Sequence, residues 1–239
     1  MQIQVLEMNK WETPASRYEK KVVGDYMLHK KTNKSGYYAY HGIDGYTMLY
    51  VRYPYQTTIL MQQREGRLSW REWMVDSPTD YRAMQKYAEA ATGRVLTTGL
   101  GLGLVTHELC KNPTVTDITV VEISPNVVEL VSGYLPHDER IHIIVDDFWK
   151  FVEKDRETWD CIIVDIWVYY GREQQIEQYV KEIVPANVRL REKYPTAKLF
   201  FHGFAGMPTL DELEKTERAG DDTNPLIYGL GGNHAQGHT

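Results

Sequence analysis

Short apolar runs alternate with helical patterns through the middle of the chain. Five runs of four to six mostly apolar residues are typical of strands, and segments with apolar residues at helical spacing separate them. Strands that are apolar along their whole length indicate a parallel sheet with helices on both faces. The expected strands are 95–98, 118–123, 141–145, 161–166 and 198–201, and the expected helices are 104–111, 125–134, 148–154 and 173–193.

The residues before this alternation have a different pattern. They are rich in tyrosine, threonine and valine, and short strands are expected at 46–52, 57–63 and 68–73. A hairpin turn is expected between the last two, because Gly66 can adopt a positive φ. The polar segment 30–36 is expected to be a loop.

A helix is expected to join the two regions. Ser77 is a candidate N-cap, Pro78 suits the first helical position, and Asp80 follows the cap by three residues. Apolar or aromatic residues follow at helical spacing, and Gly93 is expected to end the helix.

These patterns predict an α/β fold: a Rossmann-like, doubly wound and mostly parallel sheet with an N-terminal β-hairpin extension. The expected divisions are a β-rich extension over 1–75, a nucleotide-binding domain over 76–205, and a short helix (211–218) with a flexible tail within 206–239.

The turn after the first parallel strand carries the clearest chemical signal. It contains Gly99, Gly101 and Gly103, and the next strand ends on an acid, Glu122. Glycines let a backbone approach a ligand closely, and an acid at this place accepts hydrogen bonds from ribose hydroxyls. A dinucleotide-binding turn needs a glycine where this chain has Leu104, and no Gly-Lys-Ser/Thr of a phosphate-binding loop follows.

These residues resemble the class I S-adenosylmethionine-dependent methyltransferases. In that superfamily a Gly-x-Gly-x-Gly turn holds the methionine part of the cofactor, and an acid after the third strand accepts the adenine amino group. The resemblance aligns Asp146 with that acid; Asp147 competes for the role, or instead caps the following helix. The resemblance implies S-adenosyl-L-methionine as cofactor, with contacts from Gly99, Leu100, Gly101, Gly103, Glu122, Ile123, Asp146, Asp147 and Asp165.

Within that superfamily, about residues 46–203 resemble the spermidine synthase-like group in layout. The likeness includes the hairpins, Tyr81-Arg-Ala-Met84 at the start of a helix, and Val-Glu-Ile-Ser-Pro125 at the end of the second strand. Two departures concern acids of those synthases: the glycine turn has Leu102, and Asp165 is followed by Ile-Trp-Val without the second acid. These departures lead us to expect methyl transfer to a small-molecule acceptor.

Methyl transfer to an amine or hydroxyl requires in-line placement of the acceptor and removal of a proton. Asp165 is the candidate catalytic residue, although it could only cap the strand edge or bind the amino group of the cofactor. Trp167, Tyr169 and Tyr81 are candidates to bind the acceptor, with aromatic packing as the alternative. His202 lies after the last strand at the same edge, but catalysis by it is the less favoured interpretation.

Two other functions stay open at this point. The same fold could transfer the aminopropyl or aminocarboxypropyl arm of the cofactor, or cleave or cyclise the cofactor. Alternatively, the chain could bind S-adenosylmethionine without catalysis, since the second acid is missing.

Composition narrows the partners. A net charge of −6 argues against a broadly basic surface for nucleic acid. No apolar run approaches the roughly 18–20 residues of a membrane helix, and the N-terminus lacks a signal-peptide pattern, so a cytoplasmic protein is expected. Cys110, Cys161 and the histidines near the C-terminus lack the spacing of a metal site, so no metal is expected. Hairpin regions often pair protomers in the resembling group, which makes a homodimer through the N-terminal region a further hypothesis.

Overall fold

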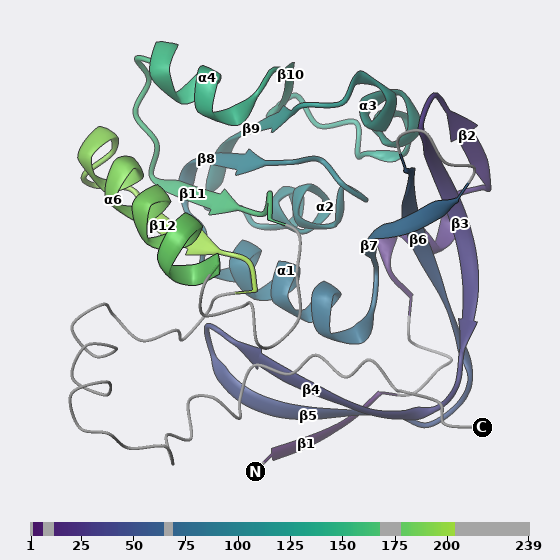
Figure 1. Ribbon diagram of the computed structural model, residues 1–239. Coiled ribbons are helices and arrows are strands. Elements are labelled where there is room, and N and C mark those ends of the chain that lie inside the picture. The colour runs from purple at the N-terminus through teal and green to yellow at the C-terminus, as the bar shows by residue number, and fades with distance from the viewer. Residues whose placement is uncertain (1, 7–11, 65–68, 168–177, 204–239) are drawn as a thin grey trace.

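The computed structural model describes residues 2–6, 12–64, 69–167 and 178–203, and these residues form three β-sheets with helices around the largest sheet (Figure 1). The two smaller sheets come from the N-terminal part of the chain, and the large sheet comes from the rest.

The large sheet has five parallel strands in the order β10-β9-β8-β11-β12. The chain runs outward from β8 to β10 and then returns to β11 on the other side of β8. This reversal opens a crevice at the carboxyl ends of β8 and β11, which is where ligands bind in such sheets. The Rossmann-like, doubly wound arrangement is therefore confirmed. The strands are β8 (Gly93–Thr98), β9 (Val115–Glu122), β10 (Ile141–Val145), β11 (Cys161–Val164) and β12 (Lys198–Phe201).

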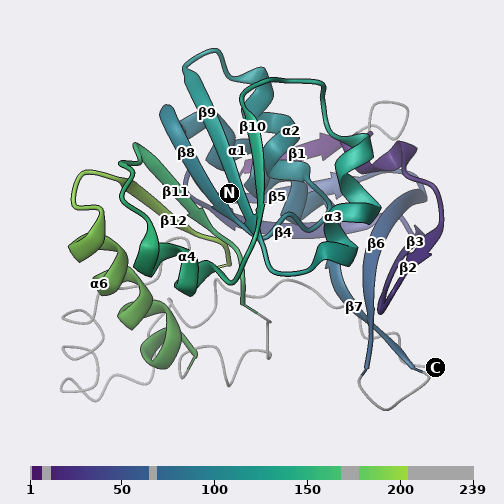
Figure 2. The same ribbon diagram turned by 90° about the horizontal axis from the view of Figure 1, so that it is seen from above.

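Alternate residues of β8, β9, β11 and β12 pack in two different helix layers, as the two-residue repeat of a strand requires, whereas in β10 only Ile141 and Ile143 pack on a helix layer. The sheet lies between a layer of α1, α2 and α3 and a layer of α4 and α6 (Figure 2). Ile163 packs in the first layer, whereas its neighbours Ile162 and Val164 pack in the second. We call these the α1 face and the α6 face. The helices are α1 (Pro78–Ala90), α2 (Leu104–Lys111), α3 (Pro125–Val131), α4 (Phe148–Lys154) and α6 (Val184–Lys193).

The N-terminal region forms two sheets. One is antiparallel in the order β2-β3-β6-β7, and the other has the order β1-β5-β4, in which β1 is parallel to β5. The strands expected at 46–52, 57–63 and 68–73 correspond to β5, β6 and β7, and a homodimer through this region stays a prediction. The strands are β1 (Gln2–Leu6), β2 (Lys21–Val23), β3 (Tyr26–Asn33), β4 (Gly36–Gly42), β5 (Gly45–Val51), β6 (Tyr55–Gln63) and β7 (Trp70–Val75).

The prediction of a loop at 30–36 is wrong. Every residue of β3 as far as Asn33 pairs with β6, and β4 begins at Gly36. The polar side chains are accommodated because they bond across the strand pair: Lys30 Nζ donates to Thr58 Oγ1 (2.7 Å) and Asn33 Nδ2 donates to Thr57 Oγ1 (2.8 Å). Cross-strand hydrogen bonds thus replace the apolar alternation that the sequence pattern lacks.

The helix that joins the two regions begins as predicted. Ser77 Oγ accepts a hydrogen bond from Asp80 N (3.2 Å), and Pro78 occupies the first turn. The helix ends at Ala90, with Ala91 as its C-cap, and Gly93 adopts a φ of +66° as the first residue of β8. The glycine therefore turns the chain into the sheet and does not terminate the helix.

Parts of several expected elements lie outside the described residues. These parts are Gly66 in the β6–β7 hairpin, residues 173–177 of the long helix, and the helix and tail expected after 205. The hairpin pairing itself is confirmed, because β6 and β7 are antiparallel and Arg64 N donates to Ser69 O (3.0 Å). Within the described segments, no helix combines the length and apolar character that crossing a membrane requires.

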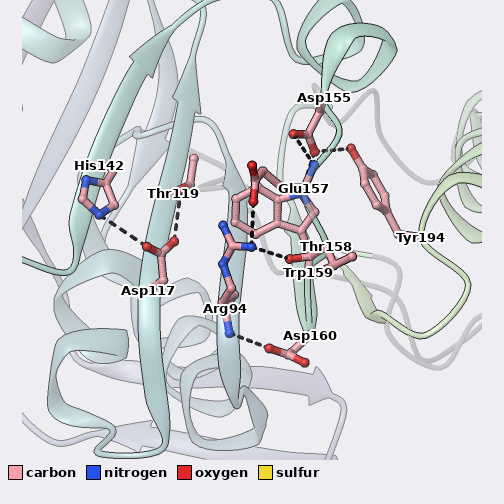
Figure 3. Close-up of polar contacts among 10 residues, drawn as sticks. All are labelled: Arg94, Asp117, Thr119, His142, Asp155, Glu157, Thr158, Trp159, Asp160 and Tyr194. Atoms are coloured by element: carbon pink, nitrogen blue, oxygen red, sulfur yellow. Dashed lines mark hydrogen bonds and ion pairs between the residues drawn. The ribbon is translucent and has the colours of Figure 1, made fainter.

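A polar network holds the amino edge of the parallel sheet together (Figure 3). Arg94 N, at the start of β8, donates to Asp160 Oδ2 (2.8 Å), and the Arg94 guanidinium lies 4.9 Å from the centre of the Trp159 ring. The buried Asp155 carboxylate accepts hydrogen bonds from Trp159 Nε1 (2.8 Å) and Tyr194 Oη (2.7 Å). Asp155 thereby ties the end of α4 to the residue that follows α6.

We expect Asp155→Ala to lower the free energy of unfolding by about 2–4 kcal/mol, because the Trp159 and Tyr194 donors would stay buried without an acceptor. Burial opposes ionisation of Asp155, but these hydrogen bonds outweigh it and hold the pKa below its ordinary value. A lowered pKa in the folded state stabilises the protein above about pH 4, and this contribution is lost as the pH falls further.

Urea denaturation measures this change, with Glu153→Ala as the matched control. Glu153 makes an exposed ion pair with Arg189 (3.0 Å), so its removal should change stability by less than about 1 kcal/mol. Equal effects of the two substitutions would contradict the role assigned to Asp155.

Candidate active site

The residues predicted to bind a nucleotide lie at the carboxyl edge of the parallel sheet, on the side of the β2-β3-β6-β7 sheet (Figure 1). Contacts from the N-terminal region reach this edge directly. Tyr18 Oη donates to the carbonyl of Leu102 in the glycine turn (2.8 Å), and Leu102 N lies 3.3 Å from Met74 Sδ on β7. The N-terminal region therefore forms one wall of the site.

The glycine turn is shaped by close packing within the protein. Gly99, Gly101 and Gly103 have φ angles of +73°, +52° and +69°. A Cβ at Gly103 would lie 2.7 Å from Leu135 Cδ2, and one at Gly101 would overlap Met74 Sδ. Glycine is thus required here by the protein's own contacts as well as by any approach of a ligand.

Glu122 connects this turn to the end of β9. Its side chain accepts hydrogen bonds from Leu100 N (2.6 Å) and Ser124 N (2.8 Å), and the residue is only 6% exposed. A carboxylate has about four acceptor sites, so capacity remains for ribose hydroxyls after these two bonds. The ribose role of Glu122 stays a prediction, and the structure adds that Glu122 fixes the glycine turn.

Beyond Glu122, the structure separates the two candidate acids for adenine. Asp147 Oδ1 accepts from Lys150 N (3.0 Å) and caps α4, which is the alternative that the sequence left open. Asp146 is partly exposed, its side chain accepts a hydrogen bond from Asp147 N (2.8 Å), and Lys154 Nζ lies 3.9 Å away. Ile123 directly follows β9 at the same edge of the sheet, and its apolar side chain is 65% exposed.

Asp165 follows the last residue of β11. Its backbone N–H donates to Thr98 Oγ1 (2.8 Å) at the end of β8. Burial raises the pKa of the Asp165 carboxyl, and the nearby charge of His202 acts in the opposite direction. Asp165 is therefore a partly buried acid with a raised pKa at the crevice between β8 and β11, and its catalytic role stays a prediction.

His202 and Asp80 join Asp165 in a charged cluster. His202 N donates to Val164 O (2.9 Å), which fixes the backbone of His202 beside the end of β11, and His202 Nε2 lies 3.7 Å from Asp80 Oδ1. Burial by itself would lower the pKa of His202, but the charge of Asp165 and the contact with Asp80 outweigh it and raise the pKa to about 9.

The sequence interpretation missed this cluster. The sequence pattern accounts for Asp80 as part of a helix cap and does not indicate that Asp80 and His202 meet. The cluster could have been predicted from one topological rule: the start of α1 and the ends of β11 and β12 lie at the same edge of the sheet.

Two of the three aromatic candidates have contacts within the protein, which is the alternative that the sequence left open. Tyr81 is buried and its hydroxyl donates to Glu108 Oε1 on α2 (2.6 Å). Trp167 packs against Phe201 on the α6 face, with ring centres 5.8 Å apart. Tyr169 lies outside the described residues. An acceptor-binding role for any of the three stays a prediction.

No group of three or more histidine, cysteine, aspartate or glutamate side chains is placed to hold a metal ion in the segments that the structure describes. The cysteines are free thiols, and burial raises the pKa of Cys110 to about 11 and that of Cys161 to about 12. Both thiols are therefore protonated at neutral pH and unsuited to act as nucleophiles.

Comparison with known proteins finds a family match that contains the glycine turn, Glu122, Asp146 and Asp165 but not Asp80 or His202. The family model described as "Spermine/spermidine synthase domain" matches residues 83–186. A polyamine aminopropyltransferase from Pseudomonas syringae pv. tomato is 39% identical over 85 residues, which cover 33% of this chain and 30% of that protein. One from Korarchaeum cryptofilum is 34% identical over 96 residues, which cover 37% of this chain and 29% of that protein.

The aligned part is thus about a third of the length of these relatives. The crystal structure of spermidine synthase from Thermotoga maritima aligns with a TM-score of 0.35 and 15% identity over 58% of this chain and 57% of that one. The resemblance in layout to the spermidine synthase-like group is confirmed by the family model and the sequence relatives.

The prediction of methyl transfer is wrong. The domain model and the relatives bear the names of aminopropyl-transferring proteins, not of methyltransferases. The prediction gave too much weight to two positions, Leu102 and the residue three after Asp165. Both reactions share the glycine turn and the acid that ends the second strand, so loss of single amine contacts does not decide which arm of a sulfonium is transferred.

We expect Gly103→Ala to destabilise the protein by about 1–3 kcal/mol even without any ligand, because alanine is strained at a positive φ and its Cβ would crowd Leu135. Gly133→Ala is the control, since a Cβ there has open space around it. The free energies of unfolding of both variants decide the matter; wild-type stability of Gly103→Ala would refute the packing requirement.

Proposed function

We propose that this chain transfers the aminopropyl arm of decarboxylated S-adenosylmethionine to an amine. The observation that carries the proposal is the gathering of Glu122, Asp146 and Asp165 at one edge of the sheet, within the region that matches the spermine/spermidine synthase domain. The names of the relatives support the aminopropyl reaction.

The described residues fit the nucleoside part of such a donor. Glu122 retains acceptor capacity for the ribose, and Asp146 can accept the adenine amino group. The exposed Ile123 offers apolar contact to the base. Met74 packs against the glycine turn at Gly101 and Leu102. In the proposed complex, backbone groups of the turn lie beside the sulfonium.

The proposed reaction is a displacement at carbon. The lone pair of the acceptor nitrogen forms a bond to the aminopropyl carbon attached to sulfur, and the carbon–sulfur bond breaks with its electron pair on sulfur. The products are methylthioadenosine and an alkylated ammonium, which then loses a proton. The enzyme's task is to orient the two reactants and to accept protons from the amine.

Asp165 is the residue that we assign to proton removal. A partly buried carboxylate whose pKa is raised is a stronger base than one with an ordinary pKa, and its negative charge attracts an ammonium group. Leu102 is fully buried and directs its side chain into the core, so the glycine turn supplies no acid that could take this role. Asp165 and Asp80 are the carboxylates whose negative charges raise the pKa of His202.

We expect Glu122→Gln to weaken binding of methylthioadenosine by about 10-fold or more, because a charge-assisted hydrogen bond to ribose would be lost. Titration calorimetry measures this, and Asp117→Asn serves as the control. Asp117 lies on the same strand but pairs with His142 at the opposite edge (3.3 Å; Figure 3). Equal affinity of the Glu122→Gln and wild-type proteins would remove the ribose assignment.

We expect Asp165→Asn to reduce transfer to an amine by at least about 100-fold while donor binding persists, because general-base catalysis contributes about 10²–10⁴-fold. Mass spectrometry of reactions with decarboxylated S-adenosylmethionine and a panel of amines gives the readout. Methylthioadenosine together with an amine heavier by one aminopropyl group supports the proposal. Absence of these products from folded, donor-binding wild-type protein would reject it.

A further inference from the structure

Asp165 and His202 lie side by side because of strand register. β11 and β12 are parallel, with Val164 opposite Phe201, so the next residue along each strand is Asp165 and His202. Val164 and Phe201 both pack on the α6 face. Side chains alternate along strands, so Asp165 and His202 are directed to the other face, toward α1.

Helix α1 supplies the third member of the cluster. Asp80 is in its first turn, where a negative charge is favoured by the helix dipole, and its side chain accepts a hydrogen bond from the Ser77 hydroxyl. These contacts hold Asp80 in place 3.7 Å from His202 Nε2. Seven residues after Asp80 on the same helix, the Tyr87 ring packs edge-on against the His202 ring, with ring centres 5.9 Å apart.

The second ring nitrogen of His202 has not been used by the fold. Nδ1 is buried and has no hydrogen-bond partner among the described residues. An unpaired buried donor is costly, and such groups in native proteins usually have a function. The groups that face His202 are Asp165 from the end of β11 and Asp80 and Tyr87 from α1.

We propose that His202 is a positioning residue for Asp165: as a cation held by Asp80, it supplies the positive charge that keeps the partly buried Asp165 carboxylate ionised for the acceptor amine. The catalytic meaning of this inference rests on the proposed transfer reaction, whereas the charge arrangement does not. The cluster as a whole carries a single negative charge, from two carboxylates and one imidazolium.

The electrostatic balance supports this role. Burial and the charge of Asp80 both raise the pKa of Asp165, and His202 is the group that lowers it. Removing the cation would therefore raise the pKa of Asp165 further and leave less of the ionised base at neutral pH. His202 itself stays protonated up to about pH 9, so the cation is present throughout the neutral range.

Histidine titration by NMR in the ligand-free protein tests the charge arrangement without any assay of activity. We expect the His202 midpoint in the wild-type protein to lie well above 6.5, and to fall by about 1–3 pH units in Asp80→Asn and in Asp165→Asn. His107 is an internal control, because burial lowers its pKa to about 4 and its hydrogen-bond contact is Tyr18. A wild-type His202 midpoint near 6.5, or one unchanged in both variants, overturns the inference.

The kinetic test uses His202→Gln and His202→Lys. We expect the acid limb of the kcat/KM profile to move to higher pH by about one unit in His202→Gln, and to move back toward the wild-type position in His202→Lys, which retains a positive charge. A purely structural role would lower activity equally at every pH, and that result overturns the inference.

The two failures are distinguishable. If the NMR midpoints behave as expected but no amine is alkylated, the proposed function fails and the charge arrangement stands. If transfer occurs but the His202 midpoint is ordinary, the inference about His202 fails alone.

Discussion

The hydrogen bonds of Glu122 are the interaction on which the site depends. One carboxylate bonds the amide of Leu100 in the glycine turn and the amide of Ser124 after β9. It thereby sets the relative position of the ends of two adjacent strands. Because both amides are at the carboxyl edge, the same side chain can organise the turn and meet a ribose. A residue expected only to contact a ligand is also part of the framework.

The two edges of the parallel sheet have different characters. At the amino edge, charged and polar groups are paired with one another, as with Arg94 and Asp160 or Asp155 and its two donors (Figure 3). At the carboxyl edge, Asp165 is partly buried with a raised pKa, and the buried Nδ1 of His202 has no partner among the described residues. Buried polar groups left partly unsatisfied are a feature of functional sites, whereas paired groups serve stability.

The structure gives a physical reason for one departure from the spermidine synthase pattern, the leucine in the glycine turn. Leu102 belongs to the hydrophobic core, so the glycine turn contributes backbone and no charge. The charge at the carboxyl edge beside the turn comes instead from Asp165, Asp80 and His202, which lie at the ends of three separate elements.

The sequence by itself determined the parallel sheet, the α1 cap at Ser77 and the glycine turn followed by Glu122, because these depend on local periodicity and short-range spacing. It failed at 30–36, where pairing with β6 overrides polar composition, and at the reaction type, which the glycine turn and the strand-end acid do not distinguish. Only the tertiary structure decided that Tyr81 faces Glu108 and that Asp80, Asp165 and His202 meet. Those contacts join residues up to 122 positions apart, from Asp80 to His202, and they arise from strand order and helix packing, which no local pattern encodes.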